Sequence, residues 1–196
     1  MARLYEQQIS YSAELEVLKK RTAELLVESK VWNGFGPRPY SILLSDELRE
    51  SIQVERQEIA QANSAIATLD QLVEEHRTSL KQAEENIRRL NEDLERDAGR
   101  TNGVLDTRRE LERLRSQTAI ASIGALDAER HVRQERLSAS RVHLGLLEKQ
   151  LVFANAGLAF TDSDMRSITS RLDSEQAQLE SELAQARAML AQLSGR

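Results

Sequence analysis

Residues 48–94 read LRESIQVERQEIAQANSAIATLDQLVEEHRTSLKQAEENIRRLNEDL, and apolar side chains recur along them in steps of four and three residues. Only Glu55 and His76 interrupt this repeat, which is typical of a coiled coil. No Pro or Gly falls inside it, so the stretch predicts one helix over 46–97, roughly 78 Å long at about 1.5 Å per residue. Such a helix needs a partner helix to bury its apolar stripe.

The segment that follows predicts this partner. Residues 98–103 hold two glycines and form the expected hairpin tip, and a second long helix is expected over 104–156. If it folds back so that paired residue numbers add to 201, the apolar stripes of the two helices meet. Near the tip this register places Ile87 against Leu114 and Leu90 against Leu111.

Two further helices complete the expected fold. A helix over 3–32 carries one apolar stripe, formed by Leu4, Tyr11, Leu15, Leu18 and Leu25. Residues 33–45 hold both prolines and form a loop, and Ser45 is the expected N-cap of the long helix. A helix over 162–193 begins at a capping box formed by Thr161 and Asp164.

The helix over 104–156 has a second apolar stripe and is therefore expected to lie between two neighbours. The fourth helix is its expected second neighbour, with Ile168 on Leu151 and Leu172 on Leu147. The sequence thus predicts a single all-α domain over 1–196, an elongated antiparallel helical bundle with a long two-helix coiled-coil hairpin.

Composition narrows the function classes. The net charge of −5 argues against a nucleic-acid binder, which needs a basic face for phosphates. No cysteine is present, so disulfides and thiol chemistry are excluded. No apolar run approaches the ~18 residues of a membrane span, so the chain as given is expected to be soluble.

Charge is also distributed unevenly along the predicted hairpin. The acidic stretch 46–75 is expected to face the basic residues of the second long helix, which are Arg130, Arg133, Arg136, Arg141 and Lys149. These flanks favour the antiparallel pairing.

No pattern of catalytic, cofactor-binding or metal-ligating residues stands out. The three histidines, His76, His131 and His143, share no metal-ligand spacing. His76, expected opposite Ala125, and Glu55 are therefore interpreted as polar residues of the coiled-coil core. An enzyme is disfavoured, although a polar pocket with converging titratable groups between the helices would restore that hypothesis.

Three aromatic residues at the end of the first helix and in the loop are candidates for interaction, Trp32, Phe35 and Tyr40. One interpretation is that they close the open end of the bundle. The other is an exposed docking patch for a second subunit or another protein, because large aromatic side chains dominate interfaces.

Two short stretches resemble a known family. Residues 32–49, WNGFGPRPYSILLSDELR, and residues 158–168, LAFTDSDMRSI, flank the long coiled coil. Together they resemble the amino-terminal periplasmic region of large bacterial mechanosensitive channels of the small-conductance family. The resemblance implies a periplasmic helical region of an inner-membrane protein, which associates with sister subunits or envelope proteins and meets the membrane only through transmembrane helices that this chain lacks.

The function expected from these observations is a non-enzymatic periplasmic scaffold or oligomerisation domain of such a channel, without the pore. The alternative is a free-standing cytoplasmic coiled-coil scaffold or adaptor protein. Reading the adjoining coding sequence discriminates the two hypotheses.

Overall fold

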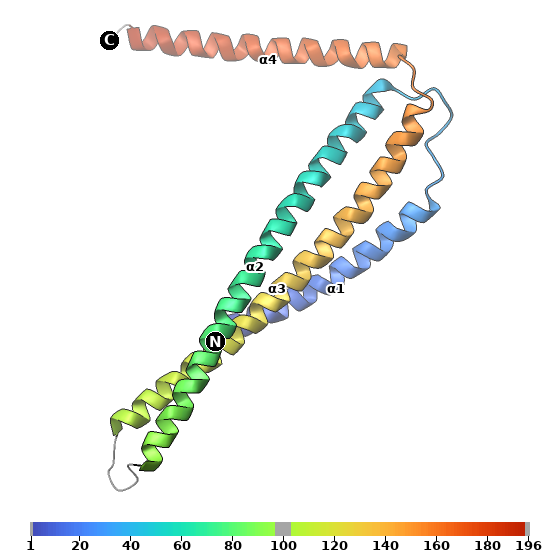
Figure 1. Ribbon diagram of the computed structural model, residues 1–196. Coiled ribbons are helices and arrows are strands. Elements are labelled where there is room, and N and C mark those ends of the chain that lie inside the picture. Colours follow the sequence, from blue (N-terminus) through green and yellow to red (C-terminus); the bar gives the residue numbers. More distant parts are fainter. Residues whose placement is uncertain (1, 97–102, 195–196) are drawn as a thin grey trace. The chain divides into compact units, whose positions relative to one another are not determined.

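A computed structural model describes residues 2–96 and 103–194 (Figure 1). Four helices make up the fold: α1 (Ala2–Val31), α2 (Ile42–Arg96), α3 (Gly103–Asn155) and α4 (Asp162–Ser194). The described residues contain no β-strand beyond one isolated bridge, so the predicted all-α class is confirmed. Within these residues no helix is both long enough and apolar enough to cross a membrane.

The helix bounds lie within a residue of the prediction, except where α2 begins. The predicted N-cap, Ser45, is wrong, because α2 starts at Ile42 and the Ser41 hydroxyl accepts a hydrogen bond from the Leu43 amide at 3.0 Å. Ser45 is fully buried in the first turns of the helix, where its hydroxyl donates to Asn155 Oδ1 at 2.9 Å. Of the predicted tip 98–103, only Gly103 is described, and it begins α3.

The chain divides into two compact units. Unit 1 contains residues 1–32 and 52–146, and unit 2 contains residues 33–51 and 147–196. The single domain over 1–196 stays a prediction.

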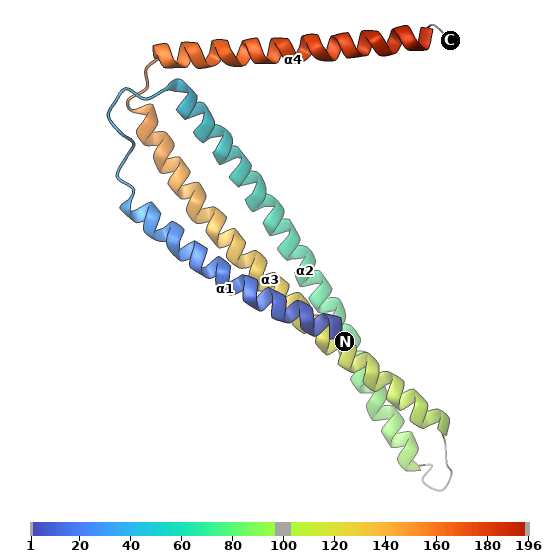
Figure 2. The ribbon, with the colours of Figure 1, turned by 180° about the vertical axis from the view of Figure 1, so that it is seen from behind.

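In unit 1, α2 and α3 lie side by side and run antiparallel (Figures 1 and 2). Three polar pairs join them: Glu55 with His143 at 2.6 Å, Asp70 with Arg130 at 3.2 Å, and Asn86 with Glu112 at 3.4 Å. The buried apolar side chains of α2 and α3 in this unit include Ile52, Leu69, Val73, Ala83, Ala119, Ala125, Val132 and Leu146. The predicted pairing of long helices is therefore present.

The polar contacts between α2 and α3 depart from the predicted register. The residue numbers of the three polar pairs add to between 198 and 200, not to 201. Leu111 and Leu114, predicted to face α2, are 48% and 58% exposed, whereas Glu112 is only 9% exposed. Near the tip Glu112 bonds to Asn86 and to Arg115, so a polar pair takes up a core position there.

α3 has two neighbours, as predicted, but in unit 1 the second is α1. The Gln8 amide donates to the Ala121 carbonyl at 3.4 Å, and Glu14 pairs with Arg136. Gly124 makes room for this contact, because a Cβ there would lie 2.2 Å from Gln8 Nε2. The predicted stripe of α1 faces inward, with Leu25 buried and the other members half-buried.

The predicted cover of the second stripe of α3 by α4 is wrong in unit 2. Leu172 is 60% exposed while Leu147 is 7% exposed, so Leu172 does not bury itself on α3. Beyond Ile168, every described side chain of α4 is exposed.

The predicted charge pairing between the two long helices is present only in part. Arg130 bonds to α2, but Arg133 bonds to Glu129 of its own helix and Arg136 bonds to α1.

Candidate functional site

The aromatic loop forms a packed cluster with α3 in unit 2. Phe35, Tyr40 and Phe153 have ring centroids 5.7 to 6.3 Å apart, in tilted and edge-on contacts. Tyr40 is buried at 7% exposure, and its hydroxyl donates to the Gly36 carbonyl at 3.0 Å. Gly34, at φ +132°, allows this packing, because a Cβ there would lie 2.5 Å from Phe153 Cζ.

The three predicted interaction residues therefore lie in different surroundings. Tyr40 is enclosed by the chain's own side chains, and Phe35 is half-buried against it. Trp32 belongs to unit 1, where its amide extends α1 by donating to the Glu28 carbonyl at 2.8 Å, and it is half-buried. The structure thus uses Tyr40 and Phe35 for internal packing, and docking by this loop stays a prediction.

A second set of contacts joins the loop to the connection between α3 and α4. The Tyr40 amide donates to the Gly157 carbonyl at 2.9 Å, and the Ala159 amide donates to the Tyr40 carbonyl at 3.0 Å. These bonds form the parallel bridge between Tyr40 and Leu158. We call this bridge, together with the Asp164 contacts described next, the joint.

Asp164 is the polar centre of the joint. Its carboxylate accepts hydrogen bonds from the Ser41 hydroxyl and from the Thr161 amide (2.7 Å) and hydroxyl (2.8 Å), so it links the first turn of α4 to the start of α2. The predicted capping box of Thr161 and Asp164 is present. The hydrogen bond from Ser41, followed by that from the Thr161 amide, lowers the pKa of Asp164 below its ordinary value of 3.8.

Glu55 lies in the core of unit 1, as a polar residue on the α2 stripe. Its Oε1 contacts His143 Nδ1 at 2.6 Å, and its side chain is 15% exposed against 40% for His143. Its other oxygen, Oε2, is buried and has no hydrogen-bond partner among the described residues. A carboxylate half satisfied in this way costs stability relative to an apolar side chain.

His76 lines a cavity of about 280 Å³ between α1, α2 and α3 of unit 1. Ala125 and Ser122 line the same cavity, and the predicted pairing of His76 with Ala125 stays a prediction. From α1 come Leu4, Gln7 and Tyr11, and from α3 comes Glu129. Three titratable side chains therefore converge here, which the sequence did not predict.

Two of these titratable groups interact with each other. Tyr11 bonds to Glu129, and the pKa of Tyr11 is raised, first by burial and then by the Glu129 carboxylate. Glu129 Oε1 also accepts two hydrogen bonds from Arg133, at 3.0 and 2.7 Å. A phenol with a raised pKa is a weaker acid at neutral pH, and a carboxylate held by two partners is a poor general base. Among the described residues no group of three or more His, Asp or Glu side chains could hold a metal ion.

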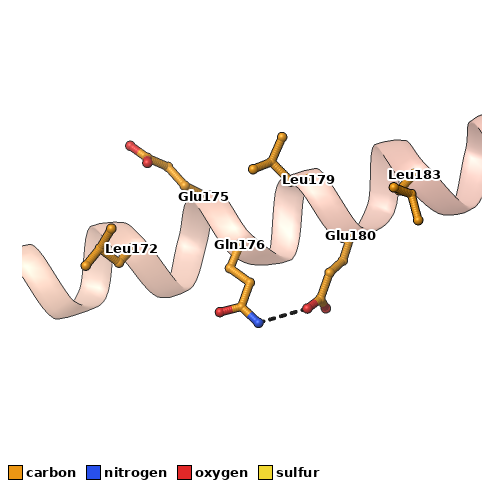
Figure 3. A pocket seen from close by; sticks show the side chains of 6 residues that line it. All are labelled: Leu172, Glu175, Gln176, Leu179, Glu180 and Leu183. Atoms are coloured by element: carbon orange, nitrogen blue, oxygen red, sulfur yellow. Dashed lines mark hydrogen bonds between the residues drawn. The ribbon is translucent and has the colours of Figure 1, made fainter.

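An exposed apolar surface lies on α4. Leu172, Leu179 and Leu183 border an open space of about 530 Å³ together with Glu175, Gln176 and Glu180. Figure 3 shows that all six side chains extend from one helix, with Gln176 donating to Glu180 at 2.9 Å. Since a single helix is convex, this is an exposed face and not an enclosed binding cavity.

Sequence reasoning missed Glu129 and Asn155, and it placed Tyr11 on the apolar stripe of α1 without its contact to Glu129, because these roles depend on contacts with a distant helix and not on a local motif. The capping signal did identify Asp164, but not its bond to Ser41. Comparison with known proteins finds no match: no family model fits the chain, and no curated protein or solved structure is significantly similar to it.

Proposed function

We propose that this chain is a non-enzymatic scaffold and oligomerisation domain that acts through the exposed apolar face of α4. This face is the observation that carries the proposal: Leu172, Leu179 and Leu183 are 51 to 64% exposed. Contiguous exposed apolar surface of this kind marks sites of protein association. The cavity of unit 1 favours no catalytic role, because its carboxylate is held by Tyr11 and Arg133.

We place the chain, by resemblance, in the periplasmic amino-terminal region of a mechanosensitive channel of the small-conductance family. The two stretches that carry the resemblance, 32–49 and 158–168, contribute Tyr40, Ser41 and Asp164 to one joint. The motifs therefore correspond to a specific set of contacts, which supports reading them together. In this proposal the sister subunits are the partners, and membrane contact belongs to transmembrane helices outside this chain.

The oligomerisation proposal is tested by the mass of the purified chain in solution. Multi-angle light scattering from about 1 to 100 μM should show a mass that rises above that of one copy, because association depends on concentration. A mass of one copy throughout this range would refute self-association.

The channel context is tested separately, by determining the coding sequence on both sides of this segment. Downstream transmembrane helices are expected. A reading frame without them would refute the channel context and favour the cytoplasmic scaffold or adaptor.

A further inference from the structure

The cavity between α1, α2 and α3 in unit 1 carries polar side chains that are free to bind a ligand. Among the residues that the structure describes, Gln7, His76 and Ser122 line this cavity without a side-chain hydrogen-bond partner. Gln7 is exposed, whereas His76 and Ser122 are half-buried, so the cavity opens to solvent beside α1. Partly buried polar groups are normally hydrogen-bonded, and a bound molecule can supply the missing partner.

Glu129 gives this cavity its charge. It is the only Asp, Glu, Lys or Arg among the described residues that line the cavity. A carboxylate has about four acceptor sites. Arg133 occupies two of them, at 3.0 and 2.7 Å, and the Tyr11 hydroxyl occupies one, so about one site remains. Arg133 itself does not line the cavity, so a ligand there meets the carboxylate and not the guanidinium.

The polar groups of the lining share the ability to accept a hydrogen bond. Besides the remaining site on Glu129, a neutral imidazole at His76 has one acceptor nitrogen, and the Ser122 hydroxyl oxygen also accepts. A primary ammonium group donates three hydrogen bonds. We propose that the cavity binds a small molecule through a primary ammonium group held by Glu129, His76 and Ser122. A carboxylate ligand would instead meet the like charge of Glu129.

The apolar part of the lining limits the rest of the ligand. Leu4, Ala125 and Leu126 form this part, and the cavity volume is about 280 Å³. A cavity of ~150 Å³ holds benzene, so there is room for one ring or a short alkyl chain beside the ammonium group. The expected ligand is therefore a small amphipathic amine. This inference goes beyond the proposed scaffold function, because it uses unit 1 and not the exposed face of α4.

Isothermal titration calorimetry of the full chain provides the test, with 2-phenylethylamine as the probe at pH 8. The matched ligand is 3-phenylpropionate, which has a carboxylate in place of the ammonium group. We expect one amine per chain, with a dissociation constant of about 1 mM or below. The affinity for 3-phenylpropionate should be lower by roughly tenfold or more, because its charge is repelled by Glu129.

Two carboxylate variants show whether the cavity is the site. Glu129→Gln should weaken binding of the amine by roughly tenfold or more, because a hydrogen bond to a charged group is lost. Glu110→Gln is the matched control, since Glu110 is an exposed carboxylate of α3 that does not line the cavity. This control should bind the amine as tightly as the unchanged chain does.

His76→Leu supplies an independent variant, because Glu129→Gln also disturbs the contacts with Arg133 and Tyr11. It removes one acceptor and leaves those contacts in place, so it should also weaken binding of the amine by roughly tenfold. Three results would each overturn the inference: no saturable binding of the amine, equal affinity for the amine and the carboxylate, or unchanged affinity in both cavity variants. The proposed scaffold function would stand in each case.

Discussion

Truncating Leu146 should destabilise the chain far more than truncating Leu111, although both are leucines of α3 in unit 1. Leu146 is 2% exposed, and a buried Leu→Ala substitution costs about 2 to 5 kcal/mol, from lost burial and the cavity left behind. Leu111 is 48% exposed, so Leu111→Ala loses only part of that burial and leaves no enclosed cavity, at a cost below about 1 kcal/mol.

The two variants form a matched pair, because the residue change and the helix are the same and the helix-propensity term cancels. Thermal denaturation, followed by circular dichroism at equal protein concentration, should lower the melting temperature of Leu146→Ala by roughly 4 to 20 °C. That range follows from about 2 to 4 °C per kcal/mol for a chain of this size. Leu111→Ala should shift it by less than about 4 °C.

Equal losses for the two variants would refute the observed register. They would mean that Leu111 is buried against Leu90, as the sequence alone predicts. Leu114→Ala supplies an independent check, because Leu114 is 58% exposed and was also predicted to face α2. It should behave like Leu111→Ala.

Three further outcomes are expected. Gly34→Ala should cost about 1 to 3 kcal/mol, because Gly34 has φ +132° and a Cβ would strike Phe153, whereas Gly36→Ala, with open space around it, should be nearly neutral in the same urea titration. His76→Leu should raise the melting temperature by about 2 to 4 °C, by removing a polar side chain from the coiled-coil core, and a fall would contradict this. Because the pKa of Asp164 is lowered in the folded chain, its carboxylate stabilises the fold above pH 3.8, and this stabilisation is lost as the pH falls through the lowered pKa. The Asp164→Asn variant should therefore have a lower melting temperature than the unchanged chain at neutral pH, and its melting temperature should fall less on acidification.

The helices themselves could be predicted from the sequence, because apolar periodicity and breakers are local signals. The start of α2 could not be placed. Ser41 and Ser45 are both acceptable caps locally, and the choice depends on Asp164 and Asn155, which bond to them from more than 100 positions away.

The helix pairing near the tip and the second neighbour of α3 could not be predicted, because several surfaces compete for the same buried positions. A stripe through Leu111 and Leu114 is the more apolar choice, yet Asn86 and Glu112 meet instead, because a hydrogen-bonded polar pair also fills a core position. Likewise, periodicity showed that α3 has two buried sides but could not tell α1 from α4 as the cover. Gly124 allows Gln8 of α1 to approach, but a glycine within a helix does not indicate which helix will cover it.

The joint also determines how a pulling force would pass through unit 2. Tension applied along α4 reaches the end of α3 through the chain itself, and it reaches the start of α2 through Asp164 and the two backbone bonds of Tyr40. The load is thus shared by α2, through its first turn, and by α3, through its last turn. Protonation of Asp164 would weaken the share carried by the Ser41 hydrogen bond, because a neutral carboxyl group is a weaker acceptor than a carboxylate.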